Sequence, residues 1–257
     1  VRESIMAIQG LMDARVFLGG YEYTSYSNSL TTDYGVEVLD ETVFGDTTRT
    51  NRAGLRTFTF SMNGFRDDGA ATPFGDSGGT AYSRIGASRE VFSFSPVGTA
   101  DGQRAFTIRG VNGTYTPLSG TVGDLLPFEL SGNAAHSELI KGVVEGVGAK
   151  TSTAASTGTQ LGALSATQTL YAGMHVIAYD GTSPTLDVVI ESANNSGFSG
   201  ESSRITFTQN TGSIEAQWGS VNGAVTDDYW RSKMTIGGGG PSFTVFITLG
   251  IGSLAIS

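Results

Sequence analysis

Alternation of apolar and polar residues with a period of two is the feature that most constrains the fold of this chain. It is clearest over residues 58–62 (Phe-Thr-Phe-Ser-Met), 91–94 and 204–208. Successive side chains of a strand point to opposite faces of a sheet, so these runs predict strands with one solvated face. Clusters of Gly, Asn, Asp and Ser separate the runs and favour tight turns. The pattern therefore predicts an all-β fold of sandwiches or barrels.

Helical signals are scarce by comparison. Residues 1–12 and 73–85 are the two short helix candidates, and glycines weaken the second. The chain has 37 glycines, 39% hydrophobic residues and 15% charged residues, a balance that suits a turn-rich β protein with a buried core. At 257 residues it is long enough for two domains of ordinary size.

A change in composition predicts where the two domains meet. Residues 146–164 are small and polar and show no apolar period, which is typical of a linker or a long exposed loop. The prediction is a first β domain over 1–133, a linker or loop over 134–164 and a β-sandwich over 165–257. Two separately packed cores are expected, so that deletion of residues 150–257 leaves a first domain that still assembles.

Charge and cysteine content exclude several classes of function. Because the chain has no cysteine, disulfides, thiolate metal sites and cysteine nucleophiles are excluded. A net charge of −9 disfavours binding to nucleic-acid phosphates, which depends on lysine and arginine. No apolar run approaches the roughly 18–20 residues of a membrane span, and the first residues lack the order of a secretory signal, so a cytosolic origin is expected.

One short motif is typical of a catalytic site. Residues 75–79 read Gly-Asp-Ser-Gly-Gly, the string around the nucleophile of chymotrypsin-like proteases, and Ala-Ala-His at 134–136 is similar to their histidine segment. In those enzymes the histidine precedes the serine, whereas His136 and His175 both follow Ser77. A glycine-rich loop is therefore favoured, and no hydrolase activity is expected to depend on Ser77.

The sequence also gives little support for a metal site. The two histidines have no neighbouring Cys, Asp or Glu at ligand spacing, and His175 is predicted to be a strand residue with an ordinary hydrogen bond. Asp180 and Asp187 flank a turn and could suggest calcium, but turn-forming aspartates are commoner. The sequence therefore predicts no catalytic residue, no metal and no cofactor.

Two clusters leave alternatives open. Four carboxylates between residues 37 and 46 could form a glycoside-hydrolase pair, although a solvated hairpin face is favoured. Trp218, Tyr229 and Trp230 could form a platform on which sugars stack, although core packing is favoured because such aromatics are usually buried. Exposure of both indoles would favour the platform.

Three segments in fixed order carry a family resemblance. Residues 40–47 read Asp-Glu-Thr-Val-Phe-Gly-Asp-Thr, residues 53–56 read Ala-Gly-Leu-Arg, and residues 58–65 read Phe-Thr-Phe-Ser-Met-Asn-Gly-Phe. This series resembles the major tail tube proteins of long-tailed bacteriophages, which have a T-x-F-G-D turn, an A-G-L step and a strand ending in G-F. The resemblance covers roughly residues 12–133. The second half is similar to C-terminal modules appended to such phage proteins.

The resemblance implies a non-enzymatic structural protein of the virion tail, made in the host cytoplasm. It implies a hexameric ring of identical copies, stacked into a tube through which DNA passes without specific binding. The implied partners are the protein itself, the tape measure protein and other tail proteins, with no membrane. Independently of the family, unpaired edges of long strands can be joined in a ring of identical subunits into a closed barrel.

The hairpin over 31–52, the loop over 67–86 and the N-terminal arm are the segments expected to contact other subunits. Candidates for subunit contact or for the lumen are Glu37, Asp40, Glu41, Asp46, Arg49, Arg52 and Arg56. Asp46 and Glu41 are expected to pair with Arg49, Arg52 or Arg56 across a subunit contact, and Glu37 to face solvent or the lumen. The alternatives are a surface-displayed carbohydrate- or host-binding module that uses the three aromatics, and a capsid decoration protein.

Overall fold

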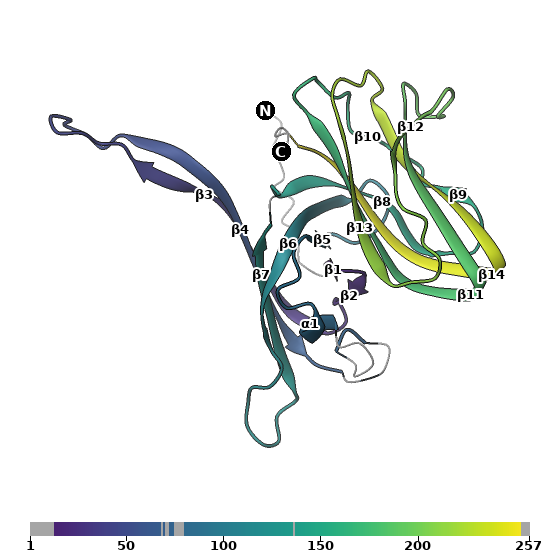
Figure 1. Ribbon diagram of the computed structural model, residues 1–257, viewed down its shortest axis with the longest axis horizontal. Helices are drawn as coiled ribbons and strands as arrows, with labels where there is room; N and C mark the ends of the chain where they lie inside the picture. Colours follow the sequence, from purple (N-terminus) through teal and green to yellow (C-terminus); the bar gives the residue numbers. More distant parts are fainter. Residues whose placement is uncertain (1–12, 68, 70–71, 75–79, 136, 253–257) are drawn as a thin grey trace, which may run out of the picture.

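The computed structural model describes residues 13–67, 69, 72–74, 80–135 and 137–252. It confirms the all-β prediction (Figure 1). Among the described residues of the predicted segment 73–85, the helix is α1 (Thr80–Ser83), and the candidate over 1–12 lies outside the described residues. Among the described residues, no helix is long and apolar enough to cross a membrane.

The N-terminal half is a sandwich of two sheets that share one strand. The first sheet has the order β3-β4-β7-β6, and the second has the order β8-β6-β5-β1-β2, where β8 (Ile140–Lys150) comes from the segment that follows this half. The strands of this half are β1 (Arg15–Leu18), β2 (Tyr21–Glu22), β3 (Ser27–Asp40), β4 (Asn51–Phe65), β5 (Glu90–Ser95), β6 (Arg104–Thr116) and β7 (Pro127–Ala134). The long β6 forms the corner, because its first part pairs with β5 and β8 and its last part pairs with β7.

The core of this half lies between its two sheets. Phe58, Phe60 and Met62 of β4 point inward at alternate positions and are buried. The ring of Phe60 stacks on Phe92 of β5, with ring centroids 4.4 Å apart. Burying a large apolar side chain contributes roughly 1.5–3 kcal/mol, so this alternation is sufficient to hold the two sheets together.

The C-terminal half is a second sandwich, made by folding one long two-stranded ribbon. β11 (Thr169–Ala193) and β14 (Tyr229–Gly252) pair from end to end, with register shifts where the ribbon bends. Gly181 and Gly238 at the bend have φ values of 119° and 111°, which favour glycine. β12 (Ser202–Thr206) and β13 (Glu215–Asn222) extend the ribbon through β11. One core cluster takes side chains from both halves of the ribbon.

The prediction of a linker or long loop over 134–164 is wrong. That segment contains β8 (Ile140–Lys150), which pairs with both β6 and β14, and two short strands, β9 (Ala154–Ala155) and β10 (Thr159–Gln160), which pair with β14. Its small residues permit close strand contact. A Cβ at Gly142 would collide with the carbonyl oxygen of Leu249. Glycine there indicates a tight strand pair rather than a flexible linker.

Each half has its own main core cluster, and a third, smaller cluster joins the two halves. Phe17, Ala105, Val144 and Phe246 are buried together on the outer face of the second sheet, and the rings of Phe17 and Phe246 stack with centroids 3.9 Å apart. The layers are therefore the first sheet, its core, the second sheet, this junction and the C-terminal sandwich. The outer face of the first sheet lies on the side away from the C-terminal sandwich.

His175 lies in this junction, within β11 as predicted. Its Nε2 lies 2.9 Å from the Ser93 hydroxyl, which in turn lies 2.8 Å from the Thr107 hydroxyl. Its Nδ1 has no hydrogen-bond partner in the structure. Burial lowers the pKa of His175 to about 3, so the ring is neutral at physiological pH.

Replacing His175 with Gln is expected to remove an acid sensitivity of the fold. The unfolded state takes up a proton near pH 6.5 and the folded state only near 3, so the free energy of unfolding falls as pH decreases between these values. The loss is roughly 1.4 kcal/mol for each pH unit below about 6.5. Urea titrations between pH 5 and 7.5 measure it as the difference between parent and variant. A difference that does not change with pH would contradict this role for His175.

The comparison of parent and variant is needed because a second buried group, Glu145, also makes the free energy of unfolding depend on pH, with the opposite direction of change. Its side chain is buried in β8, and one carboxylate oxygen accepts a hydrogen bond of 2.7 Å from the Ser156 hydroxyl. Burial raises the pKa of Glu145 to about 7 from 4.5. Its contribution to stability is therefore present below about pH 4.5 and is lost as pH rises through 7. Both proteins carry this term, so it cancels.

Candidate functional site

The outer face of the first sheet is mostly polar in its body. The rows of paired residues cross all four strands, so that Asp33, Thr59, Asn133 and Val111 lie level with one another. Alternation places the apolar side chains of β4 and β7 in the core and the intervening side chains outside. The residues on this polar face include Thr31, Asp33, Thr57, Thr59, Ser61, Asn63, Thr114, Glu129, Ser131 and Asn133.

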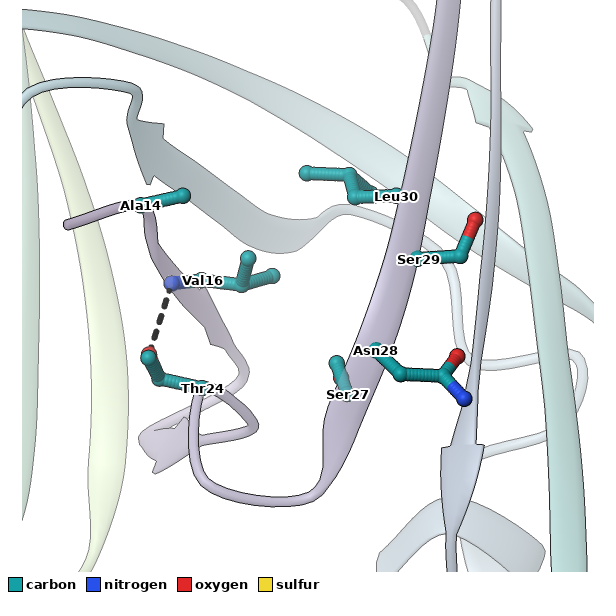
Figure 2. A pocket seen from close by; sticks show the side chains of 7 residues that line it. All are labelled: Ala14, Val16, Thr24, Ser27, Asn28, Ser29 and Leu30. Carbon is teal, nitrogen blue, oxygen red and sulfur yellow. Dashed lines mark hydrogen bonds between the residues drawn. The ribbon is translucent and has the colours of Figure 1, made fainter. Parts of the chain in front are cut away.

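One edge of the first sheet, along β3, is open. β3 pairs with β4 on one side, and no described strand pairs with its other side. A cavity of about 230 Å³ lies beside its base, between the segment that holds Ala14, Val16 and Thr24 and residues 27–30 (Figure 2). The hydroxyl of Ser27 is buried and has no hydrogen-bond partner in the structure. An open edge of this kind can accept another strand.

The opposite edge of the same sheet is open along the last part of β6. The pairing of β5 with β6 ends at Gly110, and no described strand continues along residues 111–116 on that side. A groove of about 540 Å³ lies there, between Tyr82, Ser83 and Ile85 and residues 113–115 of β6. The backbone N–H of Gly86 donates to the Asn112 carbonyl at 2.9 Å, which covers the start of this edge.

The directions of these two strands suit each other. Each of the four strands is antiparallel to its neighbour in the order β3-β4-β7-β6, so β3 and β6 run in opposite directions. A second copy of the sheet placed beside the first could therefore continue it by antiparallel pairing of β3 with β6. Because the two edges differ, the contact is heterologous and can repeat until a ring closes.

The outer part of the β3–β4 hairpin projects from the body as an arm, defined here as residues 35–57 (Figure 1). Most of its residues are exposed, including Val38, Val43 and Leu55, and Phe44 at the tip is completely exposed. Exposed apolar side chains in such number are unusual on a free surface and indicate a contact site. The arm contains most of the hairpin that the sequence predicted as a contact segment.

The predicted charged residues lie mainly on this arm. Glu41 pairs with Arg52 at 3.1 Å and Asp40 with Arg49 at 3.9 Å, both within the chain and well exposed. Hydrogen bonds from Thr42 hold the pKa of Asp40 below its usual value. Such exposed pairs contribute little to stability.

No arginine of the same chain pairs with Asp46 within the described residues. Asp46 instead accepts a hydrogen bond of 3.1 Å from the Val43 backbone N–H in the tip turn. Glu37 is exposed in the single subunit. Arg56 anchors the base of the arm through a 2.6 Å ion pair with the buried carboxylate of Glu138 and a 3.2 Å hydrogen bond to the Tyr34 hydroxyl.

Sequence reasoning missed a second apolar projection, the loop 117–126 between β6 and β7. It lies at the end of the sheet away from the arm (Figure 1) and exposes Leu118, Val122 and Leu125. Asp124 fixes the turn, because its carboxylate accepts hydrogen bonds from the backbone N–H and the hydroxyl of Thr121, which also lower its pKa. The available signal was a set of large apolar residues among turn-forming residues.

The three aromatics do not form the platform that was the alternative to core packing. Trp230 is fully buried in the C-terminal core, where its indole N–H donates to the Gly162 carbonyl at 2.9 Å. Trp218 is half-buried beside Tyr171, with ring centroids 5.6 Å apart. Trp218 pairs with Gly173 and Tyr229 with Ala193, at opposite ends of β11, so the three side chains do not share one face.

The other candidate motifs do not form a reactive centre within the described residues. Ser77 and His136 lie outside the described part of the chain. Asp180 accepts a hydrogen bond of 2.8 Å from the Gly181 backbone N–H, and Asp187 accepts one of 2.9 Å from Gln209. Within the described residues, no group of three or more His, Asp and Glu side chains could hold a metal ion.

Comparison with known proteins returned structural similarity only. No family model matches the chain, and no curated protein sequence matches it. The virion of a native gene transfer agent contains a chain with a TM-score of 0.39 and 14% identity, over 51% of this chain and 98% of that chain. The sheath-tube complex of an extracellular contractile injection system contains one with a TM-score of 0.40 and 12% identity, over 55% of this chain and 95% of that chain.

A third solved structure overlaps both halves. It is the SPP1 Dit protein, described as a paradigm of the hub adsorption apparatus in phages that infect Gram-positive bacteria. It has a TM-score of 0.36 and 10% identity, over 93% of this chain and 99% of that chain. These TM-scores are too low to establish a shared fold, so the role of this chain rests on its own geometry.

Proposed function

We propose that this protein is a structural building block of a phage-type tail, in which identical copies join β3 of one to β6 of the next and close a ring. The observation that carries the proposal is the pair of open edges on one four-stranded antiparallel sheet. Their opposite directions allow every junction between copies to continue the sheet by antiparallel pairing. A closed barrel leaves no edge open to aggregation.

In such a ring the polar face lines the channel, because the second sheet and the C-terminal sandwich cover the opposite side. The face carries hydroxyl and amide groups with the carboxylates of Asp33 and Glu129. A wall of this chemistry, on a protein of net charge −9, repels DNA phosphates rather than binding them. DNA can then pass through without being held.

Two apolar projections supply further contacts in the proposed assembly. The arm and the loop 117–126 point away from opposite ends of the sheet (Figure 1), so each can reach a different neighbouring copy or ring. Burying Phe44 or Leu55 against a neighbour contributes about 1.5–3 kcal/mol per side chain before the cost of association. Stacked rings would form a tube, with the tape measure protein and other tail proteins as its partners.

The purified protein is expected to form rings or tubes at micromolar concentration. Sedimentation velocity reports the mass of the assembly, and negative-stain micrographs show whether rings stack. Rings that do not stack would indicate a hub rather than a tube. A chain that remains monomeric at all accessible concentrations would contradict the proposal and favour a separate binding module.

A further inference from the structure

Arg89 and Arg109 form a basic pair without a carboxylate partner among the described residues. Other arginines of this half do have a carboxylate partner within the chain, as Arg84 has in Glu90. Burial and then the charge of Arg89 lower the pKa of Arg109, and its Nε is buried with no hydrogen-bond partner. Arg89 also has φ of 69°, which is uncommon outside glycine. Two like charges left together in an acidic protein indicate a missing anion.

The basic pair lies where the open edge of β6 ends. Glu90, the first residue of β5, pairs with Gly110, so Arg89 and Arg109 stand at the corner where β5 takes over this edge. The Arg109 guanidinium lies 5.8 Å from the centre of the Trp218 ring, which supports it from the C-terminal sandwich. The two cations are thus held at the side of the subunit that the proposed ring turns toward its neighbour.

Asp33 and Glu37 on β3 have the complementary arrangement. Both are exposed, both lie on the same face of the strand, and they flank Gly35. Neither pairs with a cation in the part of the chain that the structure describes. They lie on the open edge strand, so in a ring they meet the next copy.

The register of the sheet brings the two groups together. Within one copy, Asp33 lies in one row across the sheet with Val111 of β6. Gly35 pairs with Thr57, two residues further along β3, so Gly35 lies level with Arg109. Val91 of β5 already pairs with Arg109 on this side, so β3 of the next copy can pair only with the part of β6 beyond Gly110. Without a shift, Asp33 of the next copy lies opposite Val111 and diagonal to Arg109, and Glu37 lies beyond the paired edge, where Arg89 precedes β5.

We infer that Arg89 and Arg109 of one copy bind the carboxylates of Asp33 and Glu37 of the next copy. This inference rests on the proposed ring and names the charges that select its register. Charge pairs across an interface mainly fix partner and register, and like charges placed together cost several kcal/mol. The contact therefore sets which side of a neighbour each copy accepts.

A charge exchange tests the contact. The variant R89E/R109E and the variant D33R/E37R are each expected to raise the protein concentration needed for half-assembly at least tenfold, whereas the combined four-fold variant restores it. K141E on β8 lowers the net charge, as R89E/R109E does, and D180K on the C-terminal sandwich raises it, as D33R/E37R does; both positions are exposed, and both variants are expected to assemble as the parent does. Thermal unfolding of each variant confirms that its fold is retained.

The outcomes separate the inference from the proposed function. A parent that forms rings together with double variants that form them equally well overturns the contact and leaves the ring intact. Double variants that fail without rescue in the four-fold variant also overturn it, because loss without exchange indicates damage rather than pairing. A parent that stays monomeric overturns both.

Discussion

Replacement of residues 37–55 by an Asn-Gly turn is expected to abolish assembly while leaving the fold of each subunit intact. Val36 and Arg56 pair directly, so a two-residue turn can close the shortened hairpin. The removed side chains include Val38, Phe44 and Leu55, which are exposed in the isolated subunit. At about 1.5–3 kcal/mol for each one buried in the assembly, the loss corresponds to at least a thousandfold in the association constant.

Sedimentation velocity measures the lost assembly, and thermal unfolding in dilute solution measures the fold. We expect the unfolding midpoint of the armless subunit to remain within a few degrees of the parent's, because the deleted segment contributes little to the core. The double substitution V43S/F44S, which changes only the tip, is the milder control and is expected to weaken assembly without abolishing it. Armless rings of normal stability would show that the arm is not a contact element.

Deletion of residues 150–257 is expected to unfold or aggregate the remaining fragment, contrary to the expectation from sequence. The deletion removes β14, which leaves one side of β8 unpaired and exposes Phe17 and Val144 at the junction. It also removes His175 from its hydrogen bond with Ser93. Loss of the buried contacts of one large apolar side chain alone costs about 2–5 kcal/mol, which is a large share of the stability of a domain.

Solubility and cooperative urea unfolding of the 1–149 fragment measure this effect. Co-expression of the fragment with residues 150–257 is the matched control, since the second segment can restore the missing strand and is expected to recover soluble protein. A fragment that is soluble alone and unfolds in a single cooperative step would show that the junction is dispensable.

The alternation of residues was sufficient to predict strands such as 58–62 and 91–94, because a period of two follows directly from strand geometry. The same reasoning failed over 134–164, where Gly142 is small because Leu249 lies against it, not because the chain is flexible. Composition does not distinguish these two causes. Pairing between β8 and β14, about a hundred residues apart in sequence, is a property of the fold alone.

The candidate site was likewise predicted only in part. The hairpin over 31–52 was identified from the sequence, and most of it projects as the arm. The open edges of β3 and β6 could not be predicted, because an edge is defined by the strand that is missing beside it. Trp230 was assigned to either a core or a platform, and only the indole hydrogen bond to Gly162 decides for the core.

Disulfide trapping between β3 and β6 tests the central claim most directly. The parent has no cysteine, so a pair introduced at Thr31 and Thr114 reports only its own contact. These two residues lie in one row across the sheet, at its opposite edges, through Ser61 and Ser131. Pairs of Thr31 with Val111 and with Thr116 test neighbouring registers, and each single cysteine is the control.

Oxidation of assembled protein is expected to give, for one of these pairs, a ladder of covalent oligomers that ends in a single closed species, because each copy donates one edge and accepts the other. Each single-cysteine protein is expected to give no covalent ladder under the same conditions. If none of the three pairs forms a ladder in particles that are seen as rings, the copies are joined by other surfaces and the proposed pairing of β3 with β6 is wrong.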